Sequence, residues 1–334
     1  MKHNCRSKLI LPLIVCGSVL LLPSFTCAQR PKRNKPSAAA TKVRFDSGNS
    51  ALKIPLEIDN NIILMQVSVN GTKPLKFIFD TGAGMSFISS QRAAALGLKS
   101  RGEVHADATG GKIQGSFTKG VSLRVQGAEV SDQLLAWMPF NTPPGFEFDG
   151  VIGFDFINSF VVEIDYPNKI MNLYDPRTYV YSGKGEVIPL VLAGLKTPLV
   201  LVKIALAHRL VEAKLEVDTG SDDTLIINSP FVKKHNLIEA VQQTNQYTRN
   251  GAGGEQKVIV ARVEAVQLGR FILKSPPLAL SLDTEGAGAS KENDGTIGGE
   301  IFRRFKVILD YSRNQMILEP NKNFNDAYNI ESGE

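Results

Sequence analysis

Residues Phe77–Ser89 read FIFDTGAGMSFIS: one apolar run leads into Asp80-Thr81-Gly82, and a second apolar run follows it. The same order returns at Leu215–Asn228, which reads LEVDTGSDDTLIIN around Asp218-Thr219-Gly220. Each copy predicts a buried strand that delivers an aspartate to a tight turn, because glycine permits a turn geometry that a side chain obstructs. We therefore expect the fold to bring the carboxyl groups of Asp80 and Asp218 together over one water molecule.

The repeat extends beyond the two turns. Asp80 and Asp218 are 138 residues apart, whereas Asp149 and Asp294 are 145 apart, as are Met171 and Met316. Two lobes of one fold, related by approximate two-fold symmetry, explain this spacing. The alternative is two independent domains that each dimerise elsewhere, but the single short linker and the one turn per lobe argue against it.

Domain boundaries follow from this repeat and from the composition of the two ends. We predict a signal peptide at 1–28, a disordered basic linker at 29–49, an N-terminal lobe at 50–182, a C-terminal lobe at 183–323 and a tail at 324–334.

The N-terminal segment is typical of an export signal. Lys2, Arg6 and Lys8 precede an apolar stretch at Leu9–Phe25, and small residues follow before Gln29. Cleavage there predicts a secreted or periplasmic protein. The alternative is an uncleaved membrane anchor, and contact with a membrane is expected only in that case.

Composition and charge exclude several function classes. The chain has 334 residues, of which 43% are hydrophobic and 21% charged, as in globular proteins. All three cysteines (Cys5, Cys16 and Cys27) lie in the signal segment, so we expect neither disulfides nor a thiol nucleophile. Removing three basic residues there leaves 35 basic against 33 acidic residues, or +2, which does not favour nucleic acid.

Strand-forming runs dominate the remaining chain, so a mainly β protein with short helices is expected. Two glycine-rich hairpins are predicted, one with Gly110 and Gly111 at its tip and one with Gly253 and Gly254. Short helices are predicted at Gln91–Leu96 and from Pro230 to Asn236.

A single Asp-Thr-Gly turn has a plainer interpretation, in which the aspartate caps backbone amides. Two copies in register, each followed by an Ile-Gly element (Ile152-Gly153 and Ile297-Gly298), favour chemistry instead. Gly153 and Gly298 are expected to let the backbone pass close beside the turns.

With these motifs the chain resembles the retropepsin and pepsin aspartic peptidases, specifically the bacterial exported proteins with two retropepsin-like lobes. The resemblance covers most of residues 50–320, and the stretches DGVIGFDFINSFVVEIDY and DGTIGGEIFRRFKVILDY are typical of that group. It implies two β-barrel lobes related by pseudo-two-fold symmetry.

The resemblance also implies a mechanism. Asp80 and Asp218 would be the catalytic residues and share one proton, since two adjacent carboxylates do not both ionise. Thr81 and Thr219 would cross-link the turns, with support from Gly82, Ala83, Gly220 and Ser221. The hairpins at Gly110, Gly111, Gly253 and Gly254 would close over the substrate.

The second turn differs from the first. Ser221 is able to donate a hydrogen bond to Asp218, while Ala83 has no such group for Asp80, so we expect Asp218 to carry the charge. Asp222 and Asp223 are expected to line one end of the cleft and contact substrate; a solvated acidic turn is the alternative.

An arginine that retroviral relatives carry after the second Ile-Gly is Gly299 here, which places the usual pairing of Asp222 in doubt. Arg303 or Arg304 is the expected substitute.

Together these observations predict an aspartic endopeptidase that acts on peptide or protein substrates as a monomer containing an internal pseudo-dimer. No cofactor is expected, and no metal, because His105, His208 and His235 show no ligand spacing. The alternative is a non-catalytic exported protein that binds peptides in the same cleft.

Overall fold

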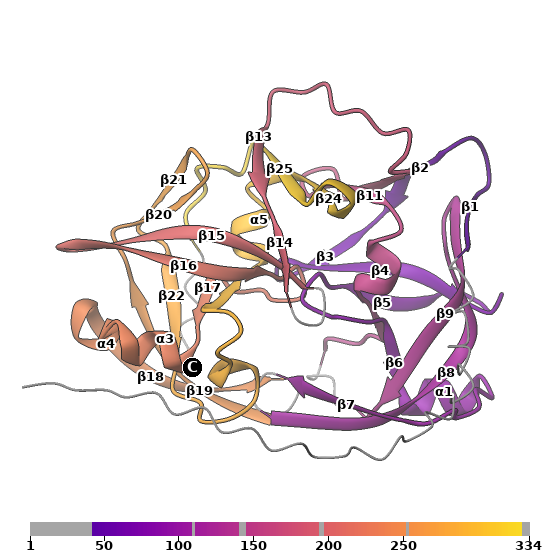
Figure 1. Ribbon diagram of the computed structural model, residues 1–334, viewed down its shortest axis with the longest axis horizontal. Coiled ribbons are helices and arrows are strands. Elements are labelled where there is room, and N and C mark those ends of the chain that lie inside the picture. Colours follow the sequence, from indigo (N-terminus) through magenta and orange to yellow (C-terminus); the bar gives the residue numbers. More distant parts are fainter. Residues whose placement is uncertain (1–41, 109–110, 140–144, 194–196, 252–253, 329–334) are drawn as a thin grey trace, which may run out of the picture. The chain divides into compact units, whose positions relative to one another are not determined.

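The computed structural model describes residues 42–108, 111–139, 145–193, 197–251 and 254–328. Most of these residues lie in β-strands and the helices are short, which confirms the prediction of a mainly β fold (Figure 1). The predicted signal peptide and the first part of the predicted linker lie outside the described residues.

The first sheet is built from strands between residues 42 and 152. Its strand order is β1-β9-β6-β10-β5-β4-β8-β7, β3 pairs with β4, and a further β8–β9 pairing joins two strands distant in this order. The strands are β1 (Lys42–Phe45), β3 (Glu57–Asp59), β4 (Ile62–Val69), β5 (Leu75–Phe79), β6 (Phe87–Ser89), β7 (Glu103–Ala108), β8 (Gly111–Val125), β9 (Ala128–Met138) and β10 (Gly150–Ile152).

A second sheet is built from strands between residues 191 and 297. Its order is β18-β19-β22-β17-β23-β16-β15-β20-β21, and β14 pairs with β15. The strands are β14 (Val191–Ala193), β15 (Thr197–Leu206), β16 (Arg209–Val217), β17 (Leu225–Ile227), β18 (Gln242–Gly251), β19 (Gly254–Arg262), β20 (Ala265–Leu268), β21 (Phe271–Lys274), β22 (Pro277–Ser281) and β23 (Gly295–Ile297).

The two sheets share one local pairing pattern around the Asp-Thr-Gly turns. β10 runs parallel to β5 and antiparallel to β6. β23 likewise runs parallel to β16 and antiparallel to β17. The strand that precedes each turn therefore has the same kind of neighbour in both sheets; a two-fold axis between lobes stays a prediction.

A third sheet combines strands from the beginning, the middle and the end of the described chain. Its order is β13-β25-β24-β11-β12-β2, and β11 pairs antiparallel with β24. The strands are β2 (Ser50–Pro55), β11 (Val161–Asp165), β12 (Ile170–Tyr174), β13 (Glu186–Pro189), β24 (Phe305–Asp310) and β25 (Gln315–Pro320).

Short helices connect these sheets: α1 (Ser90–Ala95), α2 (Phe154–Ile157), α3 (Ser229–Lys234), α4 (Leu237–Ala240), α5 (Gly299–Phe302), η1 (Ala287–Ala289) and η2 (Tyr311–Arg313). The Ser89 hydroxyl caps α1 by accepting a hydrogen bond from the Arg92 amide at 3.2 Å. Pro230 lies in the first turn of α3, where its missing N–H costs little.

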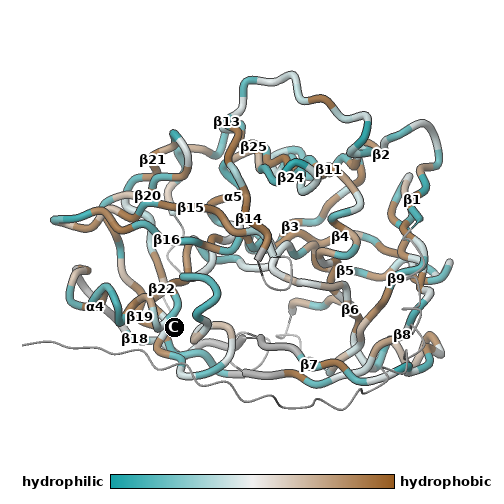
Figure 2. The backbone as a smooth tube through the Cα atoms, viewed as in Figure 1, coloured by the Kyte–Doolittle hydropathy of each residue, from teal (hydrophilic) through white to brown (hydrophobic). Residues whose placement is uncertain are grey.

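The main core is a large cluster of apolar side chains between these sheets. Figure 2 shows hydrophobic residues concentrated along the strands. Two smaller clusters are separate from this core, one around Ile78 and one around Ile308.

Both ends of the expected lobes differ from the predictions. Disorder over residues 42–49 is wrong, because β1 pairs with β9 and Arg44 lies 3.0 Å from Glu129. The predicted tail is also partly packed: the ring of Phe324 lies 5.4 Å from that of Phe305. Within the described residues, no helix is long and apolar enough to cross a membrane.

Candidate active site

Each Asp-Thr-Gly turn starts where a buried strand of its sheet ends. The amide of Asp80, after β5, donates to the carbonyl of Ile152, and the amide of Asp218, after β16, donates to that of Ile297, both at 3.0 Å. The turns are thereby fixed to β10 and β23, the strands that carry the two Ile-Gly elements.

Hydrogen bonds of two buried threonines join the turns. The Thr81 hydroxyl donates to the Val217 carbonyl at 2.5 Å, and the Thr219 hydroxyl donates to the Phe79 carbonyl at 2.7 Å. The Thr81 hydroxyl also accepts from the Thr219 amide at 3.0 Å, and the Thr219 hydroxyl accepts from the Thr81 amide at 3.2 Å. Thr81 and Thr219 are 1% and 0% exposed, so these bonds are shielded from water.

The two aspartate carboxyl groups lie against the opposite turns. A Cβ added to Gly82 would lie 2.9 Å from Cγ of Asp218, and one added to Gly220 would lie 2.5 Å from Cγ of Asp80. Glycine is therefore required at both positions, because any side chain would displace the carboxyl group facing it. The carboxyl groups of Asp80 and Asp218 are also hydrogen-bonded to each other.

The two carboxyl groups accept different numbers of hydrogen bonds from backbone amides. Oδ1 of Asp80 accepts from the amides of Gly82 and Ala83 at 2.8 and 3.1 Å, whereas Oδ1 of Asp218 accepts from that of Gly220 at 2.8 Å.

Burial raises the pKa of both aspartates. The hydrogen bond between the two groups and the negative charge of Asp80 add to this for Asp218, whose pKa is raised well above the ordinary value. For Asp80, the same hydrogen bond and the two amides oppose the rise in pKa. The geometry therefore favours a proton on Asp218 and a charge on Asp80.

This distribution is the reverse of the one expected from Ser221. Among the described residues, Ser221 makes no hydrogen bond to Asp218; its hydroxyl accepts from the Asp223 amide at 3.4 Å. The Ala83 amide, a group present in every residue type except proline, supplies the extra donor on the other side.

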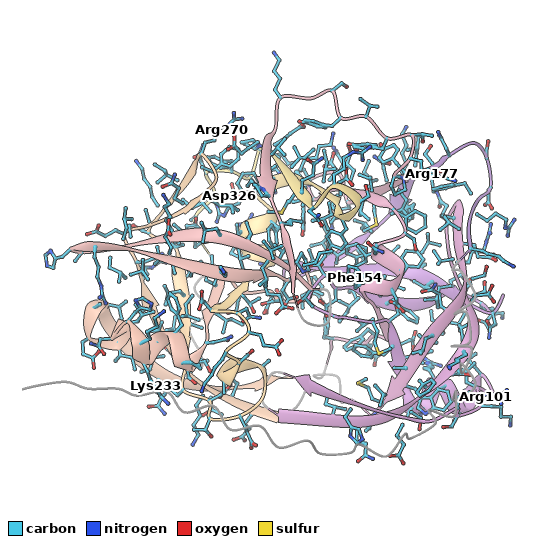
Figure 3. All side chains as sticks on the ribbon, viewed as in Figure 1. Arg101, Phe154, Arg177, Lys233, Arg270 and Asp326 are labelled. Atoms are coloured by element: carbon cyan, nitrogen blue, oxygen red, sulfur yellow. The ribbon has the colours of Figure 1, made fainter. Side chains whose placement is uncertain are left out.

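The two Ile-Gly elements pack directly on the turns. A Cβ on Gly153 would lie 2.5 Å from the Met85 carbonyl, and one on Gly298 would lie 2.4 Å from the Asp223 carbonyl. The following residues, Phe154 and Gly299, donate their amides to the carbonyls of Ala83 and Ser221 at 2.8 and 2.7 Å. Phe154, labelled in Figure 3, stacks on Tyr311 at 5.6 Å.

Asp222 is exposed and Asp223 is half-buried beside the second turn. The Asp222 carbonyl accepts from the side-chain amide of Asn61 at 3.3 Å, so this turn contacts the β3–β4 connection of the first sheet.

The two arginines expected to pair with Asp222 instead contact Glu300. Arg304 lies 2.7 Å and Arg303 2.8 Å from this carboxylate, and both Arg304 and Glu300 are buried. Arg303 also reaches Asp326, labelled in Figure 3, at 2.8 Å. Their role is to attach the 323–327 segment to α5.

The glycine-rich hairpins are formed by β7–β8 and by β18–β19, which both run along the lower edge of Figure 1. Gly111 pairs with Ala108 and Gly254 pairs with Gly251 at their ends. Gly110 and Gly253 lie outside the described residues.

Residues 65–156 match the family model described as aspartyl protease. The matched segment contains Asp80 and ends before Asp218, and it supports an aspartyl protease family and thus hydrolase chemistry. No curated protein matches the chain.

One acidic residue beside Asp218 was not predicted from the sequence. Glu216 lies two residues before Asp218 on β16, and the side-chain amide of Asn293 donates to its carboxylate at 2.9 Å. Comparison of the two repeats could have identified Glu216, because the residue 138 positions earlier is the apolar Ile78.

Proposed function

We propose that this chain is an aspartic endopeptidase in which Asp80 and Asp218 activate one water molecule between two retropepsin-like lobes, residues 50–182 and 183–323. The observation that carries the proposal is the contact between these two carboxyl groups, held by the crossed threonine hydrogen bonds. The aspartyl protease match over residues 65–156 supports the same chemistry.

The proposed reaction uses the unequal surroundings of the two carboxyl groups. The ionised Asp80 takes a proton from the water, whose oxygen attacks the scissile carbonyl carbon. The protonated Asp218 donates its proton to the carbonyl oxygen, which gives a tetrahedral gem-diol. Asp80 then passes its proton to the amide nitrogen, and the ionised Asp218 takes a proton from a hydroxyl of the gem-diol. The C–N bond breaks, the products are a carboxylic acid and an amine, and the pair again holds one proton.

The export signal expected at 1–28 and the internal repeat extend the proposal to an exported enzyme, secreted or periplasmic, that works as a monomer. Gly111 and Gly254, near the ends of the two hairpins, together with Gly110, Gly253, Asp222 and Asp223, are proposed to contact the peptide.

Single substitutions Asp80→Asn and Asp218→Asn test the proposal. Each should lower kcat for peptide hydrolysis by about 10³-fold or more, because each removes one of the two proton-transfer groups. Thermal melting of the same variants checks that they fold. Equal residual hydrolysis by the wild type and both variants would contradict the proposal and favour a non-catalytic peptide-binding protein.

A further inference from the structure

The residue two positions before each aspartate lies on the same strand face as that aspartate, because side chains alternate along a strand. In β5 this residue is Ile78, and in β16 it is Glu216. Val217, on the opposite face of β16, is 0% exposed in the main core. Ile78 and Glu216 therefore lie on the face that carries the carboxyl pair.

On the Asp80 side this face is apolar. Ile78 forms a small cluster, separate from the main core, with Leu64 and Val151 and with the partly buried Ile62, Ala83, Phe87, Phe146 and Phe148. Ala83 connects this cluster to the catalytic turn through its hydrogen bond to Asp80. Half-buried aromatic rings in the cluster that contains Ile78 and Ala83 are suited to an apolar side chain of a ligand.

On the Asp218 side the related positions are polar. Glu216 replaces Ile78 at an offset of 138, while Asn293 replaces Phe148 and Thr296 replaces Val151 at an offset of 145. The carboxylate of Glu216 accepts from Asn293 at 2.9 Å and is also hydrogen-bonded to the Thr197 side chain. These two contacts hold the half-buried Glu216 beside Asp218.

The groups around Glu216 favour a cation. Burial raises the pKa of Glu216 to about 8, and the charge of Glu292, together with that of Asp218 whenever Asp218 is ionised, acts in the same direction. Asn293 and Thr197 contribute hydrogen bonds that partly oppose the rise, and Leu199 on β15 pairs opposite Glu216. An ammonium or guanidinium group placed here would stabilise the ionised form of Glu216 and relieve the repulsion among the acids.

We infer that the site cleaves between a large apolar residue and a lysine or arginine, with the apolar side chain bound on the Ile78 side and the basic one on the Glu216 side. This inference rests on the proposed function, since it assigns the substrate class of the same site. Ile78 and Glu216 precede different members of the carboxyl pair and lie on different sheets, so the inference assigns them to opposite sides of the bond that is cut.

Matched peptides test this assignment on the full chain. The parent peptide has phenylalanine and lysine on the two sides of the cleaved bond. In the comparison peptides, glutamine or norleucine replaces lysine, or alanine replaces phenylalanine. Each peptide is made twice, once with the apolar residue before the bond and once with it after the bond. In one order, kcat/KM should favour lysine over glutamine by about tenfold or more, a size typical of one well-placed charge contact.

Two variants should alter the two preferences separately. Glu216→Gln should reduce the lysine-to-glutamine ratio to about one and retain the phenylalanine-to-alanine ratio. Phe148→Ala should do the opposite. Glu212→Gln is the control, because Glu212 lies on the same face of β16 but is exposed and contacts Lys203. The lysine preference of the wild type should also rise with pH as Glu216 ionises, and it should stay flat in Glu216→Gln.

Cleavage between two apolar residues at the same rate as between apolar and basic residues would overturn the inference, as would an unchanged lysine preference in Glu216→Gln. If the wild type cleaves no peptide, the proposed function fails separately. Binding of the same peptides, measured by fluorescence anisotropy with and without Glu216→Gln, then decides the inference: a lysine preference that depends on Glu216 supports it, and equal binding refutes it.

Discussion

The Asp80 turn and the Asp218 turn have the same backbone frame and different surroundings. In both, a strand ends in register with an Ile-Gly strand, and a threonine crosses to the other side. Around this frame, Asp80 accepts from two backbone amides and Asp218 from one, and Ile78, two residues before Asp80, corresponds to Glu216, two residues before Asp218. The backbone thus sets where the two carboxyl groups lie, and the neighbouring groups set which one holds the proton.

A second pair of related positions differs more strongly. Asp155 in α2 and Glu300 in α5 are 145 residues apart. Asp155 accepts from the amide and the hydroxyl of Ser86, both at 2.7 Å. Glu300 instead pairs with two arginines and with Asn61. Burial raises the pKa of Asp155, and its donors in the described part of the chain are the neutral groups of Ser86 and the amide of Phe156.

The largest expected effect comes from breaking the arginine cluster. Arg304→Ala should lower the free energy of unfolding by about 3–5 kcal/mol, because it leaves Glu300 buried without its closest cation. It also frees the carbonyls of residues 323–327 that the guanidinium contacts. Urea unfolding, with the midpoint and slope both fitted, measures the change.

Ser159→Ala is the matched control, since Ser159 is the residue 145 positions before Arg304 and bonds only weakly to the Asp155 carbonyl, at 3.5 Å. Its effect should stay within about 0.5 kcal/mol. If both variants lowered the free energy of unfolding by similar amounts, the arginine cluster beside α5 would contribute no more to stability than the corresponding contact beside α2.

The glycines that face the carboxyl groups give the next largest effect. Gly220→Ala should lower kcat/KM by about 10²-fold, because its Cβ would lie 2.5 Å from Cγ of Asp80 and displace a reacting group. Gly82→Ala should cost less, since the corresponding distance to Asp218 is 2.9 Å. Peptide hydrolysis is measured beside thermal melting, and the reverse order of the two losses would refute this reading of the two contacts.

Much of the site could be predicted because it depends on short motifs. Within three residues, Asp-Thr-Gly supplies a carboxyl group, a hydroxyl that bonds to the other turn and a glycine that permits the turn. The internal repeat identifies both copies. The packing of residues 323–328 could not be predicted, because it depends on Arg304, nineteen or more residues away in the chain. β1 was missed for a similar reason, since its strand partner lies near residue 130.

The direction of the proton preference was also beyond the sequence. Residue types indicate only side-chain donors, so the sequence predicts that Ser221 stabilises a charge on Asp218. The structure gives that role to backbone amides, and which N–H points at a carboxylate depends on the conformation of the turn. Nothing in the sequence distinguishes the backbone amide of Ala83 from the amide of any other residue.

The smallest expected effect, that of Ser221→Ala, therefore separates the two explanations. Activity should fall as pH rises through the raised pKa of Asp218, because that group must keep its proton to donate it. If Ser221 stabilised a charged Asp218, its removal would raise this pKa and move the alkaline limb of the pH–rate profile upward. The limb should instead stay in place, since the hydroxyl bonds to the Asp223 amide. Profiles of kcat/KM against pH for the wild type and Ser221→Ala measure this. A shift of the alkaline limb to higher pH in the variant would show that Ser221 stabilises a charged Asp218.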